Sequence, residues 1–223
     1  MDTKPHKPYL WLFWGLAILG LVLDQTSKYA IFASLYNDGN GGQQELIAGM
    51  FRLTADYKLE TDSGESWKSS LRTISGEHLP QVNTGALFGL GQQRNIVFTL
   101  ISIIAAMAIV YWSFRPGAVW DGWLAASLGL ILAGTLGNLY DRFIFDGVRD
   151  FLHWYYWVNW PVFNIADCCL VCGASLLMIQ AMFATSETNS ETTEPSGEAT
   201  VSSTDPKPVK SGKIPATVSA VQD

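Results

Sequence analysis

The sequence is poor in charged residues and in cysteine, and each scarcity excludes a class of protein. Charged residues make up 15% of the 223 positions, whereas a typical soluble domain has about 25%. The formal net charge is −6, and the sequence has no basic surface to meet phosphates, which excludes a nucleic-acid-binding protein. The three cysteines, Cys168, Cys169 and Cys172, stand together inside an apolar run. This clustering excludes a secreted scaffold that is held together by disulfides.

Histidine is also scarce, and His6, His78 and His153 are scattered along the chain. Because no histidine lies near the cysteines in sequence, the cysteines indicate a metal site only weakly. Thiols in an apolar helix are most often small apolar filler. No serine or cysteine has a base at a recognisable spacing, so nucleophilic catalysis has no support. We expect neither a metal nor an organic cofactor.

Apolar residues, in contrast, form four stretches that are long enough to cross a hydrocarbon layer of about 30 Å, which takes about 20 helical residues. These stretches cover residues 9–35, 95–114, 119–140 and 161–184. Tryptophan and tyrosine cluster at their ends, as in an interfacial aromatic belt. The first stretch is too long for a cleaved signal peptide and carries charges near its end. We therefore predict an all-α integral membrane protein with four transmembrane helices, which residues 1–184 form as one domain.

Two polar segments accompany the apolar stretches. Between the first two predicted helices, residues 51–60 alternate apolar and polar side chains, which is typical of a half-buried strand. The glycine-rich residues 39–42 before it predict a turn. We therefore expect a small β segment and an insertion within residues 36–93. Residues 185–223 are rich in Ser, Thr, Glu, Pro and Lys, a composition that predicts a disordered tail.

The polar residues of the apolar body converge on one side of the membrane. Consecutive helices alternate in direction, so the ends of the first and third predicted helices share a side with the starts of the second and fourth. The residues at these ends are Asp24, Lys28, Asn83, Arg94, Asn138, Asp141, Arg142, Asp150, Asn164 and Asp167. Ionisable residues in membrane helices are costly and are candidates for function. The sequence therefore predicts a site that is open to one side. Counting positive charges gives three against three and leaves the orientation undecided.

Simpler interpretations exist for several of these residues. Asp24 and Lys28 are four residues apart and are consistent with a plain ion pair. Asp141 and its neighbour Arg142 are consistent with an ordinary helix end that meets water. Asp167 differs, because it lies about six residues into an apolar stretch, where an unpaired carboxylate is expensive.

Two carboxylates at a membrane interface have a known chemistry. Two aspartates held close together cannot both ionise, so they share one proton. The ionised partner takes a proton from water as the water attacks an amide carbonyl, and the protonated partner donates to the carbonyl oxygen. Such a pair titrates as a unit.

Five blocks of residues lie at or near the ends of the predicted helices, namely Leu23–Lys28 (LDQTSK), Asn83–Phe88 (NTGALF), Gly137–Arg142 (GNLYDR), Val148–Phe151 (VRDF) and Phe163–Asp167 (FNIAD). Together, in this order, they resemble the pattern of the bacterial lipoprotein signal peptidase (signal peptidase II) family of membrane aspartyl proteases. The resemblance covers roughly residues 9–184. It implies that Asp150 and Asp167 are the catalytic dyad. It further implies a polar frame and supporting residues, namely Asp24, Lys28, Asn83, Gly85, Asn138, Asp141, Arg142 and Asn164.

The resemblance also implies the substrate and the placement in the cell. The expected substrate is a prolipoprotein whose lipobox cysteine carries diacylglycerol, which is cut on the N-terminal side of that cysteine. We expect a multi-pass protein of the bacterial inner membrane, with both termini cytoplasmic and the active site on the extracytoplasmic side. A small β-cradle from the segment between the first two helices is expected to rest on the membrane. The expected partners are these substrates and membrane lipid, with the enzyme itself a monomer.

The chain departs from the family pattern at several places. Arg149 stands where an apolar residue is common, Leu87 where a small residue is common, and Thr135 where glycine is common. A polar insertion separates Thr54 from Asn83. We hypothesise that this insertion lies over the outer mouth of the cleft and governs access of the substrate, as a gating lid does.

Two other classes of protein compete with this interpretation. A small transporter or channel-like protein would place polar groups near mid-membrane and open to both faces. A structural scaffold would have no reason to carry Asp167. The residues 95–114 contain no charge, and the polar cluster is one-sided, so both alternatives are less consistent with the sequence.

Overall fold

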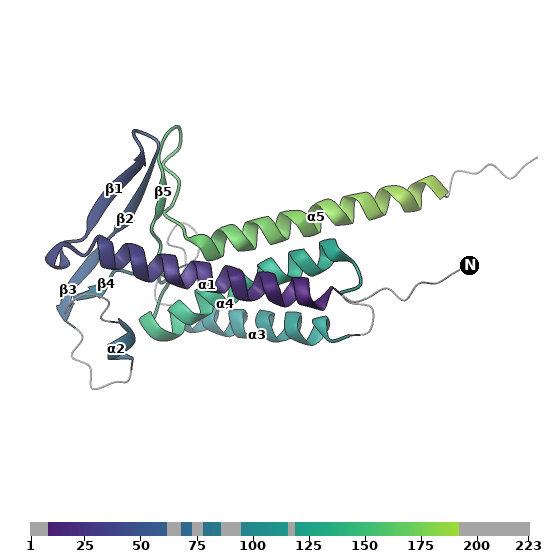
Figure 1. Cartoon of the computed structure of the whole chain (residues 1–223), viewed down its shortest axis with the longest axis horizontal. Helices are drawn as coiled ribbons and strands as arrows, with labels where there is room; N and C mark the ends of the chain where they lie inside the picture. Colours follow the sequence, from purple (N-terminus) through teal and green to yellow (C-terminus); the bar gives the residue numbers. More distant parts are fainter. Residues whose placement is uncertain (1–8, 62–67, 73–77, 86–94, 116–118, 192–223) are drawn as a thin grey trace, which may run out of the picture.

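Four long helices run along the long axis of the molecule (Figure 1). The computed structural model describes residues 9–61, 68–72, 78–85, 95–115 and 119–191. Side chains are described for all of these residues except 59–61 and 184–191. The helices are α1 (Leu10–Ser34), α3 (Asn95–Ser113), α4 (Gly122–Phe145) and α5 (Ile165–Glu191). Each of the four is long and apolar enough to cross a membrane. The prediction of four such helices is confirmed.

Two helix boundaries differ from the predicted ones. Helix α4 continues to Phe145 and ends at Asp146, which adopts the left-handed conformation with φ 60°, so Asp141 and Arg142 lie inside the helix. Helix α5 begins only at Ile165, after Asn164. It continues to Glu191, so residues 185–191, which we expected to begin the disordered tail, are helical. Residues 192–223 lie outside the described part.

The expected small β segment is present as two antiparallel sheets, so the all-α class is corrected. Strands β1 (Gly42–Ile47), β2 (Phe51–Ala55) and β5 (Leu152–Trp154) form one sheet in the order β1-β2-β5, and β3 (Tyr57–Thr61) pairs with β4 (His78–Pro80). The single strand expected over residues 51–60 is split at Asp56, whose carbonyl accepts a hydrogen bond from the Gln81 N–H at 2.8 Å. Because β5 lies between α4 and α5, the sheet is not built only from the segment between the first two membrane helices.

Helix α4 is the centre of the bundle and packs against α1, α3 and α5. Its glycines allow close approach of its neighbours. A Cβ on Gly129 would lie 2.6 Å from the Phe13 carbonyl oxygen of α1, and a Cβ on Gly134 would lie 2.3 Å from the Ala166 carbonyl oxygen of α5. Small residues at helix contacts are how membrane helices gain packing energy. The outer faces of α1, α3 and α5 expose large apolar side chains such as Ile104 and Met178, which suits contact with lipid.

The described part of the insertion lies at the end of α4. Helix α2 (Ser69–Arg72) and its neighbour Lys68 contact the last turn of α4: Lys68 Nζ donates to the Phe143 carbonyl at 2.7 Å, and Arg72 Nε donates to the Ile144 carbonyl at 2.5 Å. A short 3-10 helix, η1 (Asn37–Gly39), follows α1. Figure 1 shows α2 and both sheets at one end of the bundle, with the start of α1 and the end of α5 at the other.

Candidate active site

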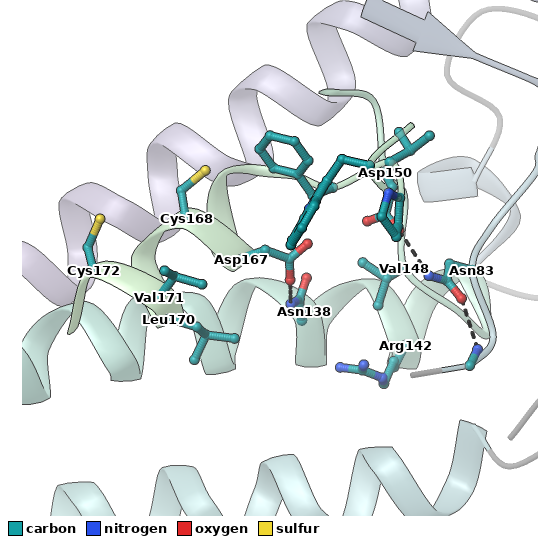
Figure 2. Close-up of a pocket in the computed structure, with 15 residues that line it drawn as sticks. Asn83, Asn138, Arg142, Val148, Asp150, Asp167, Cys168, Leu170, Val171 and Cys172 are labelled. Atoms are coloured by element: carbon teal, nitrogen blue, oxygen red, sulfur yellow. Dashed lines mark hydrogen bonds between the residues drawn. The ribbon is translucent and has the colours of Figure 1, made fainter. Parts of the chain in front are cut away.

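A cavity of about 620 Å³ lies at the end of the bundle that carries the sheets (Figure 2). Its polar lining includes Asn83, Asn138, Arg142, Asp150 and Asp167, and its apolar lining includes Val148, Trp160, Phe163, Leu170 and Val171. The cavity therefore joins the two aspartates that the sequence singled out with an apolar wall from α5. The polar lining of the cavity thus lies at one end of the helix bundle.

Asp167 lies in the first turn of α5, where its position is fixed by a reciprocal cap. The Asn164 side-chain oxygen accepts the Asp167 N–H at 3.0 Å, and Asp167 Oδ2 accepts the Asn164 N–H at 3.2 Å. An N-cap residue and an acidic residue three positions later satisfy free N–H groups at a helix start in this way. Asn138 of α4 donates to the other carboxylate oxygen of Asp167 at 2.9 Å. The helix start and the direction of this carboxylate are thus set by the same residues.

Asp150 lies in the segment that joins α4 to β5. Backbone hydrogen bonds between Val148 and Asn83, at 2.8 and 2.9 Å, hold this segment beside residues 80–85. The Asn83 amide donates to Asp150 Oδ2 at 3.1 Å, and the Asn164 amide donates to Oδ1 at 2.6 Å. Asn164 therefore hydrogen-bonds to both aspartates, which places the two carboxylates in one connected site.

Burial and the charge of Asp167 raise the pKa of Asp150 from 3.8 to about 7, against the opposing effect of hydrogen bonds from Asn83 and Asn164. Both causes disfavour the ionised form of Asp150. Near neutral pH, Asp150 therefore holds a proton for much of the time beside a second carboxylate. This is the state in which one carboxyl donates a proton while the other accepts one.

Three of the predicted supporting residues, Asp24, Lys28 and Asp141, are fully buried and do not line the cavity. Lys28 Nζ lies 2.8 Å from Asp24 Oδ2 and 3.4 Å from Asp141 Oδ2, so the ion-pair interpretation of Asp24 and Lys28 is confirmed. The interpretation of Asp141 as part of a helix end that meets water is wrong, because its carboxylate is enclosed by cations inside the bundle.

The two buried carboxylates hold the backbone immediately before each candidate catalytic aspartate. Asp24 Oδ1 accepts the N–H of Ala166, the residue before Asp167, at 2.9 Å. Asp141 Oδ2 accepts the N–H of Arg149, the residue before Asp150, at 2.9 Å. Because Lys28 contacts both Asp24 and Asp141, it connects the residue that supports Asp167 with the residue that supports Asp150.

The remaining predicted site residues occupy different places. Gly85 lines the cavity, and its N–H donates to Asn83 Oδ1 at 3.0 Å. Arg142 lines the cavity with its guanidinium 5.8 Å from the ring centre of Phe98. Residues 86–88 of the same sequence block, and Arg94, lie outside the described part of the chain.

Two of the three cysteines line the cavity. Cys168 and Cys172 are one helical turn apart on α5 and face the cavity. Within the described residues, no group of three or more His, Cys, Asp or Glu could hold a metal ion.

Two residues of the site were not predicted to belong to it. In the sequence Arg149 stands out only as a departure from a family pattern, and Gln25 only as a member of its block. The Gln25 amide donates to Asp24 Oδ2 and to the Gly137 carbonyl at 3.0 Å each. Arg149 is a charged residue beside Asp150 in an otherwise apolar region, and this feature of the sequence could have identified it as part of the site.

The chain is similar to proteins of one known family. A family model described as "Signal peptidase (SPase) II" matches residues 77–183. The lipoprotein signal peptidase of Rhodopirellula baltica is 39% identical over 184 residues, which cover 76% of this chain and 71% of the relative. That of Syntrophomonas wolfei is 34% identical over 169 residues, which cover 75% of this chain and 90% of the relative.

Solved structures share the fold. A bacterial membrane enzyme structure superposes with a TM-score of 0.65 at 24% identity, covering 88% of this chain and 99% of the other. At that identity the likeness establishes the fold alone. A second structure with the same description gives a TM-score of 0.60 at 25% identity and covers 80% and 97% of the two chains. The matching family model, the identity to curated relatives and the shared membrane fold together show that this chain belongs to the signal peptidase II family.

Proposed function

We propose that Asp150 and Asp167 are the catalytic pair with which this enzyme removes signal peptides from prolipoproteins. Removal of signal peptides by a membrane protease is the activity of the family to which the chain belongs. The observation that carries the assignment of the residues is the position of Asn164, which hydrogen-bonds to both carboxylates at the wall of one cavity.

The pair acts as a general acid and a general base. One ionised carboxylate takes a proton from water while the water oxygen attacks the scissile carbonyl carbon, and the protonated partner donates to the carbonyl oxygen. The tetrahedral intermediate then collapses, the C–N bond breaks, and the leaving amine takes up the proton that the base had accepted. The pKa of Asp150, raised to about 7, supports a pair that holds one proton at neutral pH.

The apolar wall of the cavity supports a lipid-bearing substrate. Phe163, Leu170 and Val171 lie on the same cavity as the two aspartates. A diacylglyceryl group on the cysteine that follows the scissile bond would bury its chains against such side chains, which stabilises binding by about 0.8 kcal/mol per CH₂. Peptide and lipid would therefore be held together at the point of cleavage.

The proposed enzyme lies in the bacterial inner membrane as a monomer, with both termini cytoplasmic and the cavity at the extracytoplasmic surface. The start of α1 and the end of α5 lie at the end of the bundle opposite the sheets (Figure 1). Around the sheet end, Trp157 is 86% exposed and Trp160 is 50% exposed. Exposed tryptophans favour the membrane–water interface, which supports a cradle that rests on the outer leaflet.

The test is cleavage by purified enzyme in lipid vesicles. A prolipoprotein carrying diacylglycerol on its lipobox cysteine is expected to release its signal peptide, detected by mass spectrometry. The same prolipoprotein without the lipid is the matched substrate control and is expected to stay intact. Absence of release, or equal release from both substrates, would contradict the proposed substrate. An ion flux across the vesicle membrane without any cleavage would favour the transporter alternative instead.

A further inference from the structure

Arg149 lies between two residues that face the cavity, yet its own side chain points the other way. Val148 and Asp150 line the cavity, and alternate side chains of an extended segment point to opposite sides. Arg149 has no exposed surface and lies between α1 and α4. Its side chain therefore belongs to the support behind the site rather than to the substrate-binding surface.

Hydrogen bonds hold the edge of the Arg149 guanidinium, and aromatic rings lie over its faces. Nε and Nη2 donate to the two carboxylate oxygens of Asp141 at 3.2 and 2.9 Å, and Nη2 also donates to Gln25 Oε1 at 3.0 Å. The rings of Tyr29 and Phe145 lie 4.2 and 3.9 Å from the guanidinium carbon. Such pairing and stacking restrict the orientation of the arginine, because its planar fork fits one orientation of the carboxylate.

Arg149 also balances the buried charge behind the site. Asp24, Lys28, Asp141 and Arg149 have no exposed surface, and they comprise two acids and two bases. Without Arg149, Lys28 alone would face both carboxylates. An uncompensated charge of this kind is costly inside a protein, and the surrounding groups move to relieve it.

We propose that Arg149 is a positioning residue that sets the direction of Asp150 through Asp141. The Arg149 backbone N–H and the Arg149 side chain both donate to the same Asp141 carboxylate. These bonds fasten both ends of the residue to α4, so the next residue, Asp150, enters the cavity in a fixed direction beside Asp167. This role rests on the proposed catalytic pair and adds to it a residue that touches neither substrate nor water in the cavity.

The first test replaces Arg149 with lysine, which keeps the charge and loses the fork. The Arg149→Lys enzyme is expected to lose at least about tenfold in kcat with KM within about twofold. The alkaline limb of its pH profile is expected to move to lower pH, because an Asp150 that is farther from Asp167 and closer to water has a lower pKa. Arg115→Lys is the matched control. Arg115 lies beyond the end of α3, and its guanidinium stacks on Tyr111. Its replacement is expected to leave kcat and the pH profile unchanged. The values of kcat and KM are measured per folded enzyme in steady-state cleavage assays.

A double-mutant cycle with Asp141→Asn tests whether Arg149 acts through Asp141. The double variant is expected to be no more than about twofold slower than the slower single variant, because both substitutions break the same contact. Losses that multiply would overturn the proposal, and so would an Arg149→Lys enzyme with the parent kcat and pH profile. If Arg149→Lys does not insert into the membrane, Arg149→Gln, which removes both the fork and the charge, is expected to show the same fall in kcat with KM within about twofold. Activity of Asp150→Asn would instead refute the proposed catalytic pair, whatever Arg149 does.

Discussion

At the scale of single residues, the site uses amides to hold carboxylates at a fixed separation. Asn164 donates its side-chain amide to Asp150 and its backbone N–H to Asp167, while Asn138 donates to Asp167. Asn164 also donates to Asn138 Oδ1 at 3.2 Å. Amides supply donors without adding charge, so the repulsion between the carboxylates persists and helps to raise the pKa of Asp150.

Replacing either aspartate with asparagine is expected to abolish cleavage. Asp150→Asn and Asp167→Asn keep the size of each side chain but remove the group that exchanges a proton, and general acid–base catalysis contributes about 10²–10⁴-fold to a rate. Single-turnover cleavage measures the loss, and circular dichroism shows whether the helix content is unchanged. A variant that retained activity within about tenfold, which is about 1.4 kcal/mol of barrier, would remove that residue from the pair.

The activity is expected to fall as the pH rises through about 7. Asp150 has its pKa raised from 3.8 to about 7, so above this pH it loses the proton that the pair needs. The hydrogen bond from Asn83 favours the ionised form of Asp150. Asn83→Leu removes that donor and is therefore expected to move the alkaline limb of the kcat profile to higher pH. A limb that stays in place or moves to lower pH would show that Asn83 does not tune this carboxyl.

Chelation is expected to leave catalysis unchanged. The two carboxylates are bound by asparagine amides, and the described residues include no cluster of three or more His, Cys, Asp or Glu that could hold a metal. Treatment with EDTA should leave kcat within about twofold of the untreated enzyme. A loss of activity that zinc restores would instead revive Cys168 and Cys172, which line the cavity, as metal ligands.

At the scale of elements, helix α2 acts as an external cap for α4. The last carbonyl groups of a helix lack partners within the helix. Lys68 and Arg72 donate to two of these carbonyls, those of Phe143 and Ile144. Arg72 also pairs with Asp146, the residue that ends the helix, at 2.5 Å. The insertion thus stabilises the point from which the chain leads to Asp150.

Replacing Arg72 is expected to lower stability more than affinity. Arg72→Met removes a hydrogen bond and an ion pair with Asp146, whose side chain is 66% exposed. The free energy of unfolding is therefore expected to fall by about 1 kcal/mol. This cost lowers the Tm by about 2–4 °C for a chain of this size. Thermal unfolding in detergent measures the change, with Arg115→Met as the matched surface control.

The same variant bears on the hypothesis that the insertion is a lid. Of the insertion, the described residues 68–72 and 78–82 do not line the cavity, and the segments 62–67 and 73–77 lie outside the described part. A lid would alter KM when its anchor is released. A raised KM for Arg72→Met with an unchanged Tm would favour the lid over the cap.

The sequence predicted the elements whose signal is local and missed those that depend on distant partners. The four membrane helices follow from long apolar stretches alone. Strand β5 is three residues long and pairs with β2, about a hundred residues earlier in the chain. No pattern in the residues around Leu152 therefore predicts this strand. The strand expected over 51–60 is two strands because Asp56 turns the chain toward β4, a pairing that periodicity does not encode.

Much of the site follows from the alternating direction of the helices, which by itself predicts that Asp150 and Asp167 lie on one side of the membrane. The buried network does not follow from the sequence. Whether Asp141 meets water or Lys28 depends on the rotation of α4 against α1, and the sequence does not specify that rotation. The reciprocal cap between Asn164 and Asp167 could have been predicted from the sequence, because Asn164 stands three residues before Asp167.

At the scale of the whole molecule, the site, both sheets and α2 gather at one end of the bundle, and the start of α1 and the end of α5 lie at the other (Figure 1). The proposed topology, with four spans, places the start of α1 and the end of α5 on the same side of the membrane. In that topology the candidate site lies at one surface of the membrane, and the exposed apolar side chains of α3, such as Ile96 and Ile104, suit contact with lipid. Under the proposed function, a lipid-bearing substrate enters such a site from the plane of the membrane.

This arrangement predicts that two introduced thiols react from opposite sides of the membrane. The starting protein has its native cysteines, Cys168, Cys169 and Cys172, replaced by alanine, and must first be shown to cleave substrate. Val158→Cys lies beside β5, where Val158 is 61% exposed, and Ser202→Cys lies in the tail. A membrane-impermeant maleimide added to spheroplasts is expected to label the first thiol and not the second. In inverted vesicles the pattern should reverse, because the reagent then meets the cytoplasmic side. Labelling of both thiols from the same side would refute the proposed topology, and labelling of Ser202→Cys alone in spheroplasts would reverse it.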